Sequence, residues 1–251
     1  MKVVAPSAVL LHATPYPAHV IEAAGRTCYQ SHPQATRCPE CDGAHHVAVG
    51  SNVLQQCSLC GDYGTAPESA EAFTRMVLAR GHESVVEHVS AGVLIMCDRG
   101  VSHEVVRHRL ATYSQESTRY CDYAAGRFGG ELSFVAPPGL TALQQVTWTG
   151  AMRDAEQRYL DLRQRCGDPV PPELARSVLP TALKTALAMT CNAREWRHFL
   201  RLRLAPPAHP QMRQVARLIA KVLMGWCAPL FDDVVMGASP VVGAPRAEGH
   251  S

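Results

Sequence analysis

Apolar residues recur at helical spacing in several parts of this chain. In residues 68–80, Ala70, Phe73, Met76 and Val77 lie on one face of a helix, and Gly81 follows as a C-terminal stop signal. The same spacing predicts further helices at 18–29, 100–110, 140–166, 172–177, 193–204 and 211–226. The apolar positions of the longest predicted helix are Leu143, Val146, Met152, Tyr159 and Leu162.

Shorter runs of apolar and β-branched residues predict strands. They lie at 2–11, 88–97 and 132–135, and an apolar segment at 183–190 precedes the helix at 193–204. Strands and helices do not alternate as they would in βαβ units, so we expect an α+β fold. The motifs GxGxxG, GxxxxGK[ST] and GxSxG do not occur, and the dinucleotide-binding, P-loop and hydrolase classes therefore have no support.

A stretch of different composition interrupts the periodic pattern. Residues 30–67 are rich in Cys, Gly, His, Gln and Ser and have few periodic apolar positions, so they cannot form a core of their own. The chain of 251 residues suits a single domain, which we place at 1–235 with an insertion at 36–62. The small and polar residues 236–251 are expected to form a disordered tail.

Composition and charge exclude several classes of protein. The chain is 47% hydrophobic and 18% charged, so it can bury a core and is not intrinsically disordered. A net charge of +2 is too small for a protein that coats nucleic acid by charge alone. Its uncharged stretches are broken by polar residues, prolines and glycines, and its first residues lack the pattern of a signal peptide. We expect a cytoplasmic protein that does not enter the membrane.

Four of the ten cysteines form two CxxC pairs with fifteen residues between them, which is the spacing of a structural zinc site. The predicted ligands are Cys38, Cys41, Cys57 and Cys60. Four sulfur ligands leave no open position on the metal, so the zinc is expected to hold the insertion together and to do no chemistry. Iron would also fit the sulfur count, His45 or His46 could replace a ligand, and the four cysteines could instead be free thiols.

The densest group of polar side chains lies at 107–120. It contains three arginines, one histidine and several hydroxyl groups. Guanidinium groups bind phosphate through two bonds each, and hydroxyl groups can fill its remaining acceptor sites. From the residues alone, this segment fits either an anion site or the solvated end of a charged helix.

Four segments resemble, in the same order, the motifs of the flavin-dependent thymidylate synthases. Arg107-His108-Arg109 is followed after seven residues by Ser117, as in the RHR-x7-S signature of that family, and Arg119-Tyr120 also agrees. GHESVVEH at 81–88 resembles its GHE[ST]xxEH segment. ARSVLP at 175–180, NAR at 192–194 and LR at 202–203 resemble the ARxxLP, NAR and terminal LR segments. The resemblance extends over most of residues 3–231.

The resemblance implies an enzyme that methylates dUMP to dTMP. Methylenetetrahydrofolate would donate the carbon, NADPH would reduce a bound FAD, and no cysteine would attack the uracil ring. The family's α+β fold is implied, together with a homotetramer whose active sites are shared between subunits. The substrates are then small molecules, and no nucleic acid is bound.

The resemblance also implies two sets of ligands. The residues implied to bind dUMP are Glu104, Arg107, Gln115, Glu116, Ser117, Thr118, Arg119, Arg176 and Arg203. Those implied to bind FAD are His82, Ser84, Arg107, His108, Arg109, Gln115, Asn192, Ala193, Arg194 and His198, with His82 beside the flavin ring. Arg203 is implied to be catalytic, because a fixed guanidinium beside uracil favours the form ionised at N3.

Two positions depart from the family pattern. Glu104 stands where the family often has Gln, and it could still accept a bond from the ribose while adding repulsion near a phosphate. His198 takes the place of an Asn of the flavin pocket. The segment with the CxxC pairs lies where a typical member has a short connection, so no role for it transfers.

Two other functions remain open at this stage. The CxxC pairs could form a zinc ribbon that grips nucleic acid, with Arg194, Arg197, Arg201 and Arg203 as a basic face. Against this, residues 38–60 contain no Lys or Arg, and those arginines could be a solvated helix face. The other alternative is a flavoprotein of the same fold that has lost synthase activity.

Overall fold

A four-stranded antiparallel sheet lies at the centre of the molecule, in the strand order β2-β5-β8-β6. The computed structural model describes residues 1–28, 30–44, 46–49, 53–164 and 167–237. The strands are β1 Lys2–Val4, β2 Ser7–Ala13, β3 His46–Val49, β4 Val53–Gln56, β5 Ser90–Asp98, β6 Thr112–Gln115, β7 Ser133–Val135 and β8 Lys184–Asn192. β1 and β7 form a parallel pair, and β3 and β4 form an antiparallel pair within the predicted insertion.

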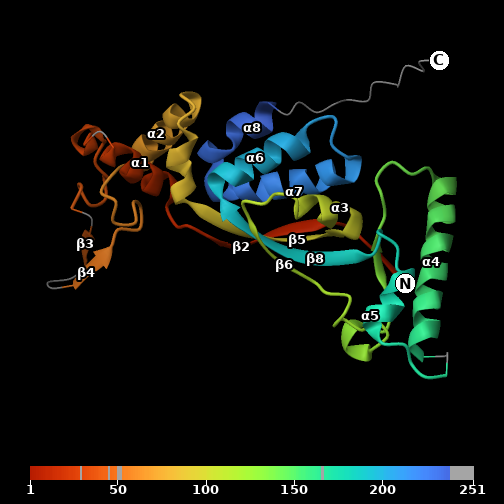
Figure 1. The fold of residues 1–251 in the computed structure, drawn as a ribbon. Coiled ribbons are helices and arrows are strands. Elements are labelled where there is room, and N and C mark those ends of the chain that lie inside the picture. The colour runs from red at the N-terminus through yellow and green to blue at the C-terminus, as the bar shows by residue number, and fades with distance from the viewer. Residues whose placement is uncertain (29, 45, 50–52, 165–166, 238–251) are drawn as a thin grey trace, which may run out of the picture.

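Helices cover one face of the central sheet (Figure 1). The helices are α1 Pro17–Thr27, α2 Pro67–Ala79, α3 Arg99–Val105, α4 Ala142–Gln164, α5 Pro172–Ala175, α6 Ala193–Leu204, α7 Pro210–Cys227 and α8 Asp232–Gly237. Shorter 3-10 turns are η1 His32–Gln34, η2 Glu83–His88, η3 Gly126–Phe128, η4 Arg176–Val178 and η5 Ala228–Leu230. Helices α6 and α7 lie over the sheet, and α1, α2 and the β3–β4 pair lie at one end of the molecule.

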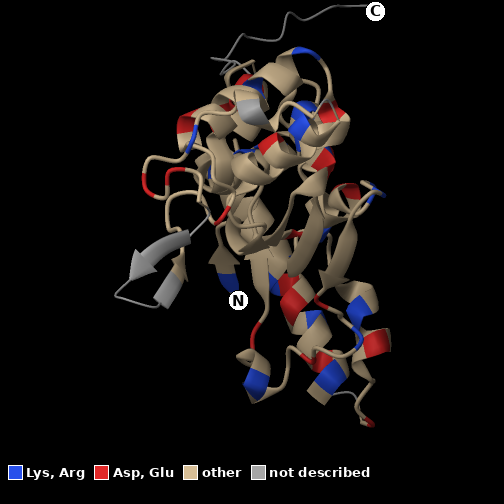
Figure 2. Cartoon of the chain, turned by 90° about the vertical axis from the view of Figure 1, so that its left-hand side faces the viewer, with Lys and Arg blue, Asp and Glu red and all other residues tan. Residues whose placement is uncertain are grey.

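Alternation along the strands places the main core between the sheet and these helices. Val93 and Ile95 of β5 and Leu187 and Met189 of β8 are fully buried, as are Trp196 and other apolar residues of α6 and α7. The four strands of the sheet carry only two charged residues, Asp98 and Lys184, so the strands are largely tan in Figure 2. This core confirms the predicted α+β fold.

A smaller core lies at the opposite end, between α4, β7 and the start of β8. It contains Tyr123, Leu132, Phe134, Met152 and Tyr159. No helix in the described part of the chain is both long enough and apolar enough to span a membrane.

Most predicted elements are confirmed. The helix predicted at 193–204 coincides with α6, and those at 18–29, 68–80 and 211–226 match α1, α2 and α7 to within two residues at each end. The predicted tail, 236–251, lies outside the described residues apart from Met236 and Gly237, which end α8.

The strand predicted at 2–11 was wrong in extent, because it is two strands in two sheets. β1 pairs with β7, and β2 pairs with β5. Pro6 separates them, and its missing N–H prevents a continuous ladder.

Two predicted helices also differ from the structure. The helix predicted at 100–110 ends at Val105, and the RHR segment follows it in a turn. In α4, Met152 and Tyr159 are buried, but Leu143 and Val146 are 78% and 69% exposed. The second core contacts α4 from Trp148 onward, so Leu143 and Val146 at the start of this helix stay exposed.

Candidate active site

The RHR segment lies in the turn between α3 and β6. The Tyr113 hydroxyl donates to the carbonyl oxygens of Val105, at 3.0 Å, and His108, at 2.6 Å. These bonds take up carbonyl groups at the end of α3, so the chain turns instead of continuing as a helix. As a result, Arg107 and Arg109 are exposed, and His108 points inward with 5% exposure.

His108 bridges two residues of α6. Its Nδ1 lies 3.3 Å from Oε1 of Glu195, and its Nε2 lies 3.0 Å from Nε of Arg203. Burial lowers the pKa of His108 to about 4, and the charges of Arg203 and His198 act in the same direction. The imidazole is therefore neutral at pH 7. Arg203 can only donate, so Nε2 accepts and Nδ1 carries the proton that is donated to Glu195.

Arg203 is held on its other side by Glu104. Its Nη1 donates to Oε2 of Glu104 at 2.8 Å, and its Nη2 donates to the backbone oxygen of Glu104 at 3.2 Å. The Arg203 side chain keeps 20% exposure. The guanidinium is thus fixed between α3 and the following turn, with part of its fork still open to a ligand. The departure at position 104 forms an ion pair with the predicted catalytic residue.

A second group lies where β6 ends. Glu116 accepts bonds from the Tyr123 hydroxyl at 2.7 Å and from Nζ of Lys184 at 2.8 Å. Burial acts to raise the pKa of Glu116, but these bonds outweigh it and lower that pKa overall, so the carboxylate is charged. Nε2 of Gln115 donates to the hydroxyl of Ser102 at 2.9 Å and to that of Thr185 at 3.2 Å. These residues form a rigid base for the turn that follows.

The exposed arginines of the predicted nucleotide set have no carboxylate partner among the described residues. Arg176 donates to the buried hydroxyl of Thr118 at 3.3 Å. Arg119 lies over the ring of Tyr120, with its guanidinium carbon 5.1 Å from the ring centroid. The backbone N–H of Arg119 donates to the hydroxyl of Ser117 at 3.3 Å. In this turn and beside it, the described arginines without an acidic partner are Arg107, Arg119 and Arg176 of the predicted nucleotide set and Arg109 of the predicted flavin set. Their charge is free for an anionic ligand.

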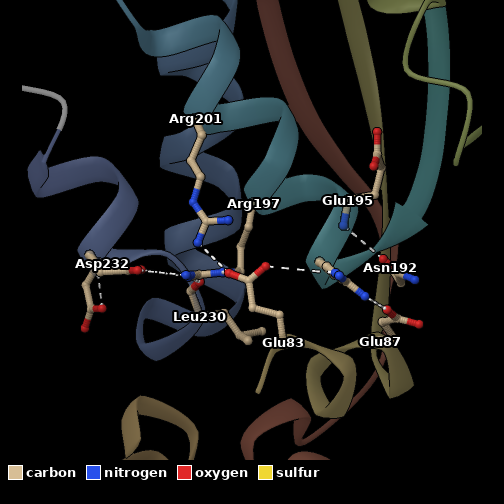
Figure 3. Close-up of polar contacts among 10 residues, drawn as sticks. Glu83, Glu87, Asn192, Glu195, Arg197, Arg201, Leu230 and Asp232 are labelled. Carbon is tan, nitrogen blue, oxygen red and sulfur yellow. Dashed lines mark hydrogen bonds and ion pairs between the residues drawn. The ribbon is translucent and has the colours of Figure 1, made fainter. Parts of the chain in front are cut away.

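A third group joins η2 to α6 (Figure 3). Glu83 lies within 4.0 Å of Arg194, Arg197 and Arg201, and Glu87 pairs with Arg194. These contacts fix η2 beside α6, while His82 and Ser84 at its start remain exposed. Arg197 is only 1% exposed in its side chain and also pairs with Asp233. The interpretation as a solvated face is therefore wrong for Arg197, whereas Arg194 and Arg201 are 53% and 44% exposed and each pairs with a glutamate.

The N-terminus of α6 lies between these groups. Oδ1 of Asn192 accepts from the backbone N–H of Glu195 at 3.0 Å and caps the helix, and Ala193 is buried. His198 is exposed, and its ring centroid lies 5.8 Å from that of His108. The structure thus brings His108, Arg203 and Glu104 into contact. Among the described residues, His82, Ser84, Arg107 and Arg109 make no side-chain hydrogen bond to another predicted ligand.

Two cavities of moderate size open beside these groups. One, of about 330 Å³, is lined by Glu116, Tyr123 and Lys184 among others. The other, of about 320 Å³, is lined by Glu104, Trp148 and His209 among others. None of the predicted FAD ligands lines either of these two cavities.

Three residues that support the site, Glu195, Lys184 and Tyr123, are not among the predicted ligands. Glu195 could have been found from the sequence, because Asn192-x-x-Glu195 has the form of a capping box at a helix start. Lys184 and Tyr123 meet Glu116 across 68 and 7 residues, and no local pattern marks either of them.

The four predicted metal ligands come together away from these groups, in the insertion. Cys38, Cys41, Cys57 and Cys60 are buried, and their sulfur atoms lie within 4.8 Å of one another. His45 lies outside the described residues.

Comparison with known proteins gives the same family over almost the whole chain. The family described as thymidylate synthase complementing protein matches residues 9–229. A flavin-dependent thymidylate synthase of Geobacter sulfurreducens is 32% identical over 231 residues, which is 91% of this chain and 86% of the relative. The enzyme of the same name from Nitratidesulfovibrio vulgaris is 29% identical over 238 residues.

Solved structures show the same fold. Thymidylate synthase X from Helicobacter pylori, solved with FAD and dUMP, superimposes with a TM-score of 0.64 at 22% identity and covers 92% of this chain and 99% of its own. The UMP/dUMP methylase PolB from Streptomyces cacaoi, bound with 5-Br dUMP, gives a TM-score of 0.66 at 19% identity, with 94% and 97% covered. The chain belongs to the flavin-dependent thymidylate synthase family.

Proposed function

We propose that this protein binds FAD and methylates dUMP to dTMP, as the names of its relatives and the ligands of the Helicobacter pylori structure indicate for those proteins. We assign the nucleotide site from one observation: the arginines at 107–119 and Arg176 have no acidic partner among the described residues. Nearly all other charges nearby are neutralised internally, so an anion is the ligand that these arginines can bind most favourably.

The nucleotide would lie against the turn that follows β6. Arg107, Arg119 and Arg176 offer the charge for its phosphate, and the hydroxyls of Ser117 and Thr118 offer shorter-range bonds. Gln115 and Glu116 are held by their neighbours and can present their remaining acceptors without reorganisation. Glu104 would face the ribose and orient Arg203 at the same time.

The flavin would lie between η2 and the N-terminus of α6. His82, Ser84 and His198 are exposed there, Arg109 supplies positive charge, and Arg194 is held by Glu83 and Glu87. The helix N-terminus at Asn192 and Ala193 favours a pyrophosphate. When bound, FAD would pass to the methyl group a hydride that NADPH supplies, with methylenetetrahydrofolate as the carbon donor.

Arg203 would act on the uracil ring. A guanidinium that is fixed on two sides can stabilise negative charge at N3 and the neighbouring oxygens without moving, and this charge makes C5 a better nucleophile. Neutral His108 contributes by accepting from Nε, so it positions Arg203 without adding a competing charge.

A homotetramer with shared sites belongs to the same proposal. The two cavities described above do not include the flavin residues, which is what a site completed by a second subunit would give. A structural zinc in the four-cysteine site and a cytoplasmic location complete it. The nucleic-acid alternative loses its basic face, because Arg194, Arg197, Arg201 and Arg203 all pair with carboxylates of the same chain.

The visible spectrum of the purified protein tests the proposal directly. We expect flavin absorbance, release of FAD on denaturation and a spectral change when dUMP is added. Protein that fails to take up added FAD would overturn the proposal, and flavin without formation of dTMP from dUMP would favour the inactive flavoprotein.

A matched pair of variants tests the nucleotide site. Arg176→Ala should raise the KM for dUMP by about 10- to 100-fold, the range for losing a charged hydrogen bond. Arg153→Ala removes an exposed arginine of α4 and should leave the KM unchanged. An equal KM for dUMP in both variants would show that Arg176 does not bind the nucleotide.

A further inference from the structure

The geometry of the four cysteines fits a tetrahedral metal centre. The sulfur atoms of Cys38 and Cys57 are 3.7 Å apart, and so are those of Cys41 and Cys60. A tetrahedron with metal–sulfur bonds of about 2.3 Å has edges of about 3.8 Å, whereas a disulfide requires about 2.05 Å. Each of these close pairs joins one CxxC segment to the other, so one ion would bind both segments.

The backbone around the cysteines favours binding of a metal ion by their thiolates. The residues after each pair are left-handed, with φ of 46° at Asp42 and 78° at Gly43, and 57° at Gly61 and 69° at Asp62. The N–H of Gly64 donates to the sulfur of Cys60 at 3.3 Å. Tight turns that aim N–H groups at sulfur stabilise thiolates, which are the form that binds zinc.

The second CxxC segment also contacts the start of α1. The Tyr16 hydroxyl donates to the carbonyl oxygen of Ser58 at 3.1 Å. The Tyr16 ring covers Gly61 so closely that a Cβ there would lie 2.2 Å from ring carbon Cδ2. Tyr16 itself is left-handed, with φ of 48°, although it is not a glycine. This unfavourable conformation is held by contacts with the insertion.

A second contact lies within the first turn of α1. Nε2 of His19 lies 3.1 Å from the carbonyl oxygen of Thr65, and its ring stacks on Tyr63 with centroids 6.0 Å apart. His19 is buried. The insertion and the residues just after it therefore contact α1 at its N-cap and in its first turn.

Helix α1 in turn packs against the proposed flavin segment. A Cβ on Gly25 would lie 2.6 Å from Phe73 of α2 and 3.2 Å from Val85 of η2, so the three elements meet without free space. η2 begins directly after His82 and contains Ser84. Displacement of α1 would thus displace the residues proposed to hold FAD.

We propose that the four cysteines bind one zinc ion and that this ion acts as a clamp on α1, so that the position of η2 depends on metal occupancy. The link to FAD rests on the proposed function, whereas the metal and the clamp do not.

Metal analysis of the full-length protein tests the site. Protein purified under reducing conditions without chelator should contain one zinc per chain, and Co²⁺ in its place should give thiolate charge-transfer bands. Cys57→Ser should lose the metal, and Cys28→Ser, which changes an exposed cysteine outside the cluster, should keep it. Absence of zinc together with no cobalt–thiolate bands would overturn the site.

Hydrogen–deuterium exchange before and after chelation tests the clamp on the unaltered chain. Removal of zinc should speed exchange in 16–27 and 83–88 while β5 and β8 stay protected, and it should weaken FAD binding by roughly 3- to 30-fold, the range of long-range coupling. Faster exchange confined to 36–62 would overturn the clamp. Protein that binds zinc and shows the exchange pattern but never binds FAD would overturn the proposed function alone.

Discussion

At the scale of single residues, the arginines of the proposed nucleotide site fall into two groups that have the same charge and different surroundings. Arg107, Arg119 and Arg176 are exposed without acidic partners, whereas Arg203 is fixed between Glu104 and His108. A free arginine can neutralise a phosphate, and a fixed one can stabilise charge that develops during a reaction.

Replacement of Arg203 tests its role in the reaction. Arg203→Ala should retain FAD but lose at least about 100-fold in turnover, the scale of one preorganised charge-stabilising donor. Arg203→Lys should recover only part, because an ammonium cannot bind Glu104 and His108 in the same plane. Formation of dTMP is measured against flavin content on the same samples. Turnover near the parent rate in Arg203→Ala would make the residue structural.

His108 makes stability depend on pH. Its pKa is about 4 in the folded protein against 6.5 when unfolded, so the unfolded chain binds the proton more tightly between these values. The contribution of His108 to the free energy of unfolding is fully present well above pH 6.5 and is lost as the pH falls from 6.5 toward 4. From pH 7.5 to pH 5 this group should cost roughly 2 kcal/mol. Denaturant unfolding of the parent and of His108→Gln at both pH values checks this, since the variant should lose that part of the pH dependence. An identical dependence in both would contradict it.

At the scale of elements, α6 connects two groups of the site, the one around His108 and the one around Glu83. Its N-terminus is capped by Asn192, one side carries Glu195 and Arg203 toward His108, and another carries Arg197 and Arg201 toward Glu83. Arg197 also binds the carbonyl oxygen of Leu230 and both carboxylate oxygens of Asp233, at 2.7 Å each, and thereby ties α6 to η5 and α8.

Two arginines of α6 provide a comparison of buried and exposed ion pairs. Arg197→Ala should lower the free energy of unfolding by roughly 3 kcal/mol, because it leaves a buried carbonyl and acidic partners without their donor. Arg201→Ala removes a side chain that is 44% exposed and should cost less than about 1 kcal/mol. Denaturant unfolding measures both. Similar losses in both variants would show that the burial of Arg197 adds nothing to the free energy of unfolding.

At the scale of the whole molecule, one face of the central sheet has no helix over it in Figure 1. Val9, Leu94, Ala188 and Ser114 lie opposite one another across the four strands, and Val9 and Leu94 are 57% and 39% exposed. An apolar row on an open sheet is typical of a surface that another subunit covers.

A charge in this row should prevent assembly. We expect the parent to have the mass of four chains of 27.2 kDa in light scattering, and Leu94→Lys to shift it to smaller species. Leu59→Lys is the control, because Leu59 is similarly exposed, at 38%, but lies in the insertion. A Leu94→Lys protein with the parent's mass would place the subunit contact elsewhere.

The elements and motifs that depend on near neighbours could be predicted from the sequence. Helical period is a local property, so α2 and α6 could be predicted within a residue or two, and the RHR-x7-S and CxxC spacings identified the candidate ligands. Strand β6 was missed, because the four residues TYSQ carry no apolar alternation. The pair β3–β4 was missed although it contains valines, because each run is only four residues long and lies in a stretch rich in Cys, Gly and polar residues. Which charges lack a partner could not be predicted, because it depends on tertiary packing. Arg203 meets Glu104 across 99 residues and Arg197 meets Glu83 across 114, and such partners are set by packing, which no local spacing encodes.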